Sequence, residues 1–239
     1  TYVIDNTGAG QYQSFYEAIN DLSCKGIGGS VIFNVTAGQT FNETNELNCL
    51  QTGTSTNTIT FQKSGTGANP IVRRIGTIND TDAVIKLMGV DYYTFDGINI
   101  EQNGTTPGTY VEFGFYLKAL PPNNGVQNNV FKNGVISLTT NSSSSRGVFM
   151  QRQFATNDEA GTNSNNRFVN MTVQQAMAGY YLSGMALDLK DHHNEITTEG
   201  LGQSIIQNLG NSILNTSVAG VYTDEQHKFS IQNTEIRLQ

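Results

Sequence analysis

The amino-acid sequence predicts an all-β chain folded as a parallel β-helix, a solenoid of about seven stacked coils. One short pattern recurs at long intervals, as in NNVFKNGVI at 128–136, NNRFVNMTV at 165–173 and HKFSIQNTEI at 227–236. The repeated segments are rich in β-branched and aromatic residues with period-2 alternation, which is typical of strands. A single segment shows the spacing of an amphipathic helix.

The helix candidate is SFYEAINDL at 14–22, near the start of the chain. Ser14 can accept hydrogen bonds from the first backbone N–H groups, and Glu17 three residues later completes a capping box. Apolar residues follow the i, i+3, i+4, i+7 spacing of one helix face; they are Phe15, Ala18, Ile19 and Leu22. Three glycines then end the helix; they are Gly26, Gly28 and Gly29. We expect residues 1–30 to cap the first coil, whose open core and strand edges need cover.

A large apolar residue anchors each repeat across 31–239. The anchors are Phe33, Phe61, Phe95, Phe131, Phe168, Ile196 and Ile231, at intervals of 28 to 37 residues. A second motif has Gly followed by two apolar or aromatic residues; it begins at Gly114, Gly147, Gly179 and Gly220. This loose period indicates a repeat architecture. Two or three short strands per repeat fit one solenoid coil better than a four-stranded propeller blade, so residues 1–239 are predicted to form one domain with the anchors stacked inside.

One corner of each coil is expected to carry Asn or Gly. Its candidates are Gly97, Asn133, Asn170 and Asn233. Asn and Gly tolerate the left-handed backbone that tight corners require, and Asn above Asn can form a ladder of side-chain hydrogen bonds. We interpret these residues as structural, without a chemical role.

Composition limits the function. The net charge of −7, from 13 basic and 20 acidic residues, argues against nucleic-acid binding because phosphates need a basic surface. Charged residues make up only 14% of an Asn-, Thr- and Gly-rich chain, which is typical of extracellular β-proteins. The sequence has no run of 18 apolar residues that would span a membrane. Cys24 and Cys49 fit one disulfide in an oxidising compartment, with two free thiols as the alternative.

Charge collects in the arches that lead from each Gly-aromatic strand to the next anchor. The candidate site residues there are Arg152, Asp188, Lys190, Asp191, His192, Asp224, Glu225 and His227, within 151–166, 182–194 and 223–228. Among the three aspartates, a pair could supply the two carboxylates of glycoside hydrolysis. Alternatively, they could bind calcium while the Lys190 or Arg152 side chain removes a proton beside a uronate carboxylate.

Two further interpretations of the arches stay open. His192 and His227, expected on neighbouring coils, could hold a transition metal, although no fixed ligand spacing supports it. Arches are also surface loops, and surface loops collect solvated charge without any chemistry.

The start and middle of the chain resemble a known group. The segments are YVIDNTGAGQYQSFYEAINDL at 2–22, GGSVIFNV at 28–35, NTITFQ at 57–62 and VDYYTFDGINI at 90–100, followed by the Gly-apolar-Tyr coils. They resemble right-handed parallel β-helix proteins of the pectate-lyase-like superfamily, in particular secreted or surface-displayed members from Bacteroidetes. The resemblance covers nearly the whole chain. It implies the fold and an extracellular or bacterial cell-surface location, but not one activity, since members include lyases, hydrolases, esterases, tailspikes, adhesins and stalks.

We therefore expect an extracellular or cell-surface module with an adhesive or structural role and carbohydrate as its ligand. The alternative is a polysaccharide lyase or glycoside hydrolase that acts through carboxylates on the arches at 151–228. Exposed tyrosines that stack on sugar rings are candidate ligand contacts; they are Tyr92, Tyr110, Tyr116 and Tyr181. The last residues, QNTEIRLQ at 232–239, lie inside an expected strand. This predicts that further domains, or copies of the same chain, cover that end.

Overall fold

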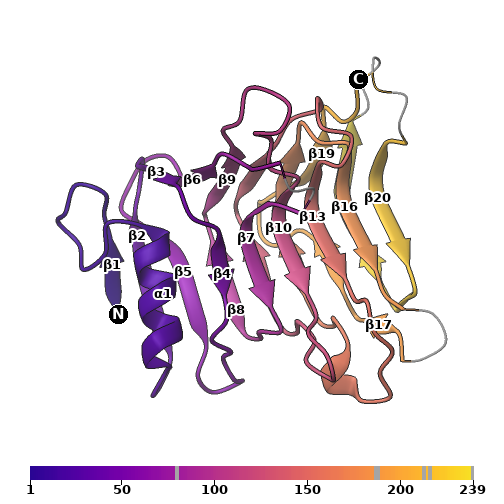
Figure 1. Ribbon diagram of the computed structural model, residues 1–239, viewed down its shortest axis with the longest axis horizontal. Coiled ribbons are helices and arrows are strands. Elements are labelled where there is room, and N and C mark those ends of the chain that lie inside the picture. The colour runs from indigo at the N-terminus through magenta and orange to yellow at the C-terminus, as the bar shows by residue number, and fades with distance from the viewer. Residues whose placement is uncertain (79–80, 186–188, 212–213, 215–216, 238–239) are drawn as a thin grey trace.

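The computed structural model describes residues 1–78, 81–185, 189–211, 214 and 217–237. Its strands form three parallel sheets that stack along one axis, from the N-terminus at one end to the last strands at the other (Figure 1). The chain visits the sheets in turn, so each coil adds one strand to each sheet, as a parallel β-helix requires. The predicted fold class is confirmed.

Sheet A, in spatial order, contains β1 (Tyr2–Ile4), β2 (Val31–Thr36), β5 (Ile59–Ser64), β8 (Tyr93–Asp96), β11 (Val130–Lys132), β14 (Arg167–Val169), β18 (Glu195–Thr197) and β22 (Ser230–Ile231). Sheet B contains β3 (Thr40–Glu43), β6 (Ile71–Arg74), β9 (Asn99–Gln102), β12 (Val135–Ser137), β15 (Thr172–Gln174), β19 (Ser204–Gln207) and β23 (Thr234–Arg237). Sheet C contains β4 (Leu47–Cys49), β7 (Ala83–Met88), β10 (Phe113–Lys118), β13 (Arg146–Gln151), β16 (Ala178–Ser183) and β20 (Ala219–Asp224). A small fourth sheet pairs β17 (Asp191–His192) with β21 (Gln226–His227), and a 3-10 turn, η1, spans Glu159–Gly161.

The predicted anchors stack in register down sheet A. Each is the Cα partner of the next, from Phe33 to Ile231. The five phenylalanine rings lie nearly parallel, with centroids 4.6 to 5.8 Å apart. All the anchors are buried except Ile231, on the last described strand of the sheet. The repeat therefore encodes a continuous aromatic ladder inside the solenoid.

The Gly-aromatic motif marks a place where sheets B and C approach too closely for a side chain. A Cβ atom on Gly147 would lie 2.2 Å from Cγ1 of Val173 and 2.7 Å from the carbonyl oxygen of Gly179. Gly114 and Gly179 meet the same obstruction on their own coils. The glycine repeat therefore has a steric cause.

Both corners that flank sheet A use left-handed backbone. At the corner from sheet A to sheet B, φ is 67°, 58°, 52° and 49° at the predicted positions Gly97, Asn133, Asn170 and Asn233. The amide Nδ2 of Asn170 donates to Oδ1 of Asn133 at 3.1 Å, as expected for stacked asparagines. The predicted structural role of this corner is confirmed.

The corner from sheet C to sheet A holds a second, interior ladder that we did not predict. Asn129 donates from Nδ2 to Oδ1 of Asn166 at 3.0 Å, and Asn166 donates to Asn194 at 3.2 Å. Asn194 donates to Gln226 at 2.9 Å, and the first three amides are fully buried. Buried polar groups must be paired, and here the side-chain amide on each coil is hydrogen-bonded to the amide on the next coil.

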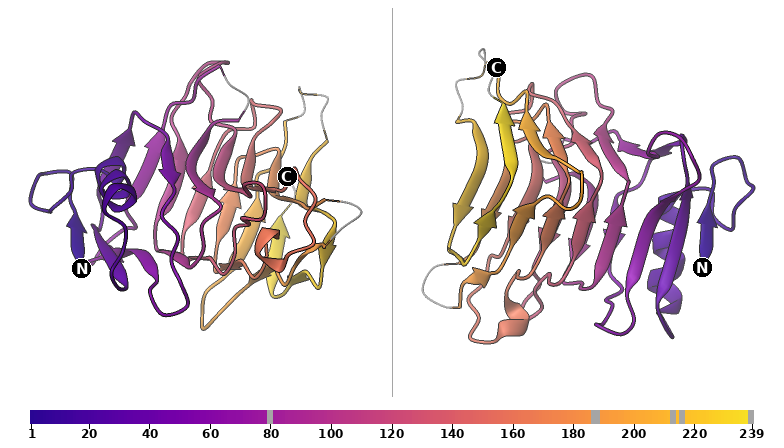
Figure 2. Two further views of the ribbon diagram at one scale, coloured as in Figure 1. Left: turned by 60° about the horizontal axis from the view of Figure 1, so that its bottom comes forward. Right: turned by 180° about the vertical axis from the view of Figure 1, so that it is seen from behind.

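Helix α1 (Phe15–Lys25) lies against the first coils, at the indigo end of the molecule in the views of Figure 2. Ser14 accepts a hydrogen bond from the N–H of Glu17 at 3.1 Å, and Gly26 ends the helix with φ 69°. The predicted apolar face of the helix is buried. Of the two alternatives for the cysteines, the structure shows the free thiols: Cys24 is exposed on the helix, while Cys49 is buried in sheet C.

The last described coil leaves apolar side chains open to solvent. Ile231 is 44% exposed and Ile236 is 47% exposed. What covers this end, whether further domains or copies of the chain, stays a prediction. No helix in the described ranges is both long and apolar enough to span a membrane.

Candidate functional site

A row of large side chains runs across the outer face of sheet C. Lys86, Tyr116, Phe149, Tyr181 and Tyr222 are Cα partners on five successive strands. Neighbouring rings are in contact, and Tyr181 stacks on Tyr222 with centroids 4.3 Å apart and planes at 17°. The row is buried at Tyr116 and Phe149 but opens toward the last coil, where Tyr222 is 39% exposed. Its open end offers an aromatic surface to a ligand.

A parallel row beside it changes from large to small residues. Ala83, Phe113, Arg146, Ala178 and Ala219 occupy equivalent positions on the same strands. Because the last two are alanines, a pocket of about 350 Å³ opens there, at the lower end of the ~300–1,000 Å³ range usual for ligand sites. Its lining includes Ser143, Ser145, Arg146, Tyr181, Ser217 and Tyr222.

Arg146 extends over this aromatic surface. Its guanidinium carbon lies 4.5 Å from the ring centroid of Tyr181, 5.0 Å from that of Phe149 and 5.7 Å from that of Phe113. In the described part of the chain it has no carboxylate partner, and its Nη1 donates to the carbonyl oxygen of Ser144 at 3.1 Å. Burial lowers the pKa of Arg146, yet an arginine keeps its charge in proteins. The Tyr181 hydroxyl in turn raises the pKa of Tyr222.

Ionisable residues gather at the other end of the same face. Glu46 accepts from Nζ of Lys86 at 2.6 Å and lies 3.7 Å from Nη1 of Arg74. The same nitrogen lies 3.7 Å from Oδ1 of Asp82, and the N–H of Asp82 donates to Glu112 at 3.1 Å. Lys86 also lies 5.9 Å from the ring centroid of Tyr116. Three carboxylates and two cations therefore meet where the aromatic row begins.

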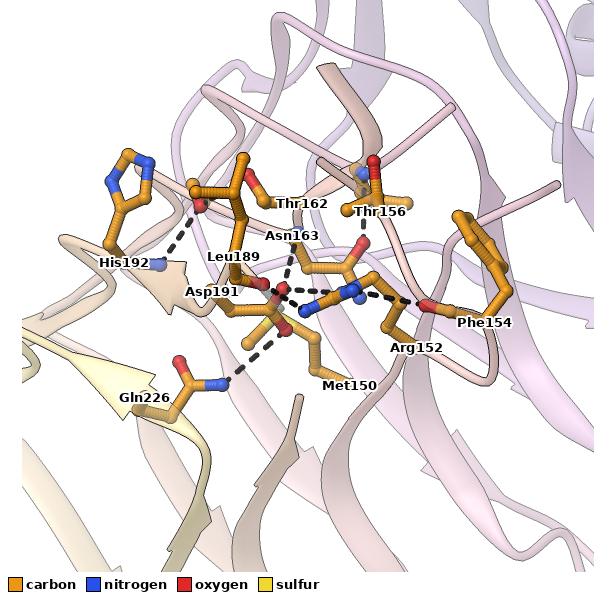
Figure 3. Close-up of polar contacts among 12 residues, drawn as sticks. Met150, Arg152, Phe154, Thr156, Thr162, Asn163, Leu189, Asp191, His192 and Gln226 are labelled. Atoms are coloured by element: carbon orange, nitrogen blue, oxygen red, sulfur yellow. Dashed lines mark hydrogen bonds and ion pairs between the residues drawn. The ribbon is translucent and has the colours of Figure 1, made fainter. Parts of the chain in front are cut away.

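The predicted arch residues Arg152 and Asp191 form a buried ion pair instead of an open site. Nε of Arg152 lies 3.1 Å from Oδ1 of Asp191, and both side chains have no exposed surface (Figure 3). The guanidinium also donates to the carbonyl oxygens of Phe154 and Leu189. Burial raises the pKa of Asp191, and this rise is opposed by the N–H of Asn163 and by the Arg152 guanidinium. A substrate cannot reach the pair in this structure, so the catalytic roles predicted for it do not fit the geometry.

The other arch residues pair with one another, end strand β20 or lie outside the described residues. Lys190 and Glu225 form an ion pair of 2.9 Å with each other. Asp224 is exposed at the end of β20, and Asp188 lies outside the described residues. The acid-base roles predicted for these residues stay predictions.

The histidines lie on neighbouring strands as predicted, since His192 of β17 is the Cα partner of His227 of β21. Nε2 of His192 lies 2.5 Å from a carboxylate oxygen of Glu159, and its Nδ1 lies 2.7 Å from Nδ1 of His193. Within the described ranges, no three His, Cys, Asp or Glu side chains are placed to hold a metal ion together. Ligand binding by the histidines and by Glu225, and the calcium considered from sequence, stay predictions.

Of the tyrosines predicted to contact sugar, Tyr116 and Tyr181 lie on the aromatic row, and Tyr181 also lines the pocket. Tyr92 instead occupies a corner with φ 59°, and Tyr110 is half-buried between β9 and β10. The sequence reasoning missed Arg146, Phe149 and Tyr222. The signal was present, because each lies next to or two places from a Gly of the repeated motif.

Comparisons with known proteins support the fold. No family model matches the sequence, and no curated protein matches it. The chain is similar to the native crystal structure of a GH136 lacto-N-biosidase from Eubacterium ramulus, with TM-score 0.53 and 13% identity over 86% of this chain and 42% of that one. The selenomethionine derivative of that enzyme aligns with TM-score 0.46 and 12% identity, over 97% of this chain and 56% of that one. This chain thus spans less than half of the native structure, and at such low identity the likeness shows a shared parallel β-helix fold.

Proposed function

We propose that this chain is a glycan-binding β-helix of the glycoside-hydrolase type, secreted or displayed at a bacterial surface, and that sugar binds on the outer face of sheet C. The observation that carries the proposal is the aromatic row that ends in the accessible Tyr181–Tyr222 stack beside a pocket. Flat aromatic rings with a polar edge suit a sugar, which has an apolar ring face and hydroxyl groups around it. A β-helix neighbour that bears the name of a glycoside hydrolase adds support.

Hydrolysis would use the ionisable cluster at the other end of the same face. Glycoside hydrolysis needs two carboxyl groups, one that donates a proton and one that acts as base or nucleophile. Glu46, Asp82 and Glu112 supply carboxyl groups at the end of the face where the row begins, and Arg74 and Lys86 are the cationic partners of Glu46 and Asp82. Glu46 is the carboxylate of this cluster that reaches solvent, with 25% of its side chain exposed, whereas Asp82 and Glu112 are buried. The Arg152–Asp191 pair has no exposed side-chain surface at all, so we locate the proposed reaction away from the arches.

Binding is tested with a panel of oligosaccharides, read out by direct binding and by release of reducing ends. We expect Tyr222→Ala to weaken binding about tenfold, because truncation of a central aromatic contact costs on the order of 1–2 kcal/mol. Tyr16→Ala is the matched control: Tyr16 is 40% exposed, as Tyr222 is 39%, but it lies on helix α1. An equal loss in both variants, or none in either, would refute sheet C as the binding face.

Catalysis is tested separately on any glycan that binds. We expect Glu46→Gln and Asp82→Asn to reduce kcat at least a hundredfold while the Kd stays within about threefold, since a lost acid or base costs about 10²–10⁴ in rate. Asp224→Asn, an exposed arch variant, serves as the control, and thermal unfolding verifies that each variant is folded. Binding without cleavage by the unmodified chain would leave an adhesive module, the first expectation from the sequence.

A further inference from the structure

Among the residues that the structure describes, Arg146 is a half-buried cation without a counterion, on a protein of net charge −7. Charged groups removed from water are normally paired with opposite charge. Arg152, which directly follows the same strand, obeys this rule through Asp191 at 3.1 Å. Arg146 faces three aromatic rings instead, and cation–π contacts stabilise a guanidinium without neutralising it. The charge of Arg146 is therefore available to a ligand.

The pocket around Arg146 can accommodate a small polar group. A guanidinium has five N–H donors, and in the described part of the chain it spends one, from Nη1, on the carbonyl of Ser144. Arg146 itself lines a pocket together with two small residues, Ala178 and Ala219. Hydroxyl groups of Ser143 and Ser217 line the same space, and the exposed ring of Tyr222 borders it. A sugar ring on Tyr222 would bring its substituent to the guanidinium.

We propose that this pocket binds an anionic group, a carboxylate or a sulfate, carried by a sugar ring that stacks on Tyr222. The proposal rests on the function proposed for sheet C and narrows its ligands to glycans with acidic units. A neutral hydroxyl could accept a hydrogen bond from Arg146, whereas an anion also neutralises its charge and can accept two parallel bonds from the planar fork. The net negative charge of the chain repels dense polyanions, so the acidic units of the ligand are sparse or terminal.

The test measures binding of four simple probes to the full chain by ligand-observed NMR and calorimetry. Methyl β-glucuronide and N-acetylneuraminic acid carry a carboxylate, glucose 6-sulfate carries a sulfate, and methyl β-glucoside is the neutral reference. We expect at least one acidic probe to bind about tenfold to a hundredfold more tightly than the neutral one, as a charge-assisted hydrogen bond allows. The carboxylate and sulfate arms show which anion the pocket accepts.

The variants separate this inference from the general proposal. Arg146→Gln should abolish the preference for acidic probes over the neutral one, and Arg146→Lys should restore part of that preference because only the planar fork is lost. Arg237→Gln on β23 of sheet B makes the same change in net charge away from the pocket and should leave the preference intact. In the unmodified chain, a higher salt concentration should weaken the binding of the acidic probes and not that of the neutral probe.

Three results would overturn the inference in distinguishable ways. Equal binding of acidic and neutral probes, sensitive to Tyr222→Ala, refutes the anion pocket and leaves the glycan-binding face in place. No binding of any probe or of any oligosaccharide in the panel refutes both. A preference that survives in Arg146→Gln places the anion elsewhere on the chain and also refutes the pocket.

Discussion

The two ends of strand β13 show how differently one residue type can be used in this fold. Arg146, the first residue of β13, lies on the outer face of sheet C over three aromatic rings. Arg152 follows the last residue of the strand and is sealed in the arches with Asp191. The arches attract attention in the sequence because charged residues are dense there, and several of these charges pair with one another. On the face of sheet C, the charges at one end pair with one another, whereas Arg146 has no carboxylate partner among the described residues and lies beside an open pocket.

Charge density along this chain is therefore a poor guide to the position of a binding site. Arches must close each coil, and buried or crowded charges there are satisfied locally. A position repeated on successive strands of sheet C, by contrast, builds a surface that spans several coils. Substitutions can test this division between charges that are buried in pairs and charges that a ligand can reach.

The largest effect is expected from the two arginines themselves. Arg152→Met should lower the free energy of unfolding by about 3–5 kcal/mol, because it leaves the carboxylate of Asp191 buried without its cation. Arg146→Met should cost less than about 1 kcal/mol, because no ion pair is broken and the stem still packs on the rings. Thermal unfolding resolves this difference, since each kcal/mol corresponds to about 2–4 °C for a chain of this size. Similar losses of stability in the two variants would show that the two arginines do not differ in this way.

The second-largest difference in stability is expected between two asparagines, one in the interior ladder and one at the outer corner. Asn166→Ala should cost about 3 kcal/mol, because the N–H and the Nδ2 of buried Asn129 both lose their acceptor. Asn170→Ala at the outer corner should cost about 1–2 kcal/mol, mainly because alanine is strained at a φ of 52°. Urea unfolding of both variants gives the comparison. A greater loss at Asn170 would show that corner strain outweighs the interior ladder.

The smallest effect concerns a carboxylate that has no cation beside it. Half-buried Asp91 accepts the N–H of Gln127 at 2.7 Å, and burial raises the pKa of Asp91 to about 6. A raised pKa in the folded state favours the protonated acid, so its contribution to stability is present below pH ~4 and is lost as the pH rises through about 6. Asp91→Asn keeps an oxygen acceptor without the charge.

This variant should therefore match the unmodified chain in stability at pH 4. At pH 7 it should be more stable by about 1 kcal/mol, a value reduced for solvent screening of a half-buried group. Unfolding curves at the two pH values provide the measurement. A stability gain of equal size at both pH values would mean that the charge of Asp91 is not the cause.

The fold was predictable from the sequence because each coil of a solenoid repeats the same residue pattern at a similar interval along the chain. Phe33 and Ile196 have weak local motifs, yet both take their expected register positions on sheet A. The pairing of His192 with His227 also follows from the period. The interior ladder through Asn129 and Asn166 was visible in the doubled Asn before Phe131 and before Phe168, but only the direction of the side chains separates it from the outer ladder.

The candidate site was predictable only in part. Tyr181 was selected as an aromatic that could contact sugar, and it lines the pocket. Nothing in the order of residues reveals that Arg152 has a carboxylate partner while Arg146 has none among the described residues, because a counterion is found by distance in space and not along the chain. For the same reason the spacing of Cys24 and Cys49 could not decide their bond, which the structure shows to be absent.

By itself, the sequence determined the solenoid, its helical cap and the stacked interior, since these depend on local propensities and on a period that each coil repeats. The tertiary structure alone decided which charges are buried in pairs, which rings reach solvent and where a pocket opens. Those properties depend on side chains brought together from coils about 30 residues apart, and small differences in size, such as Phe113 against Ala178, settle them.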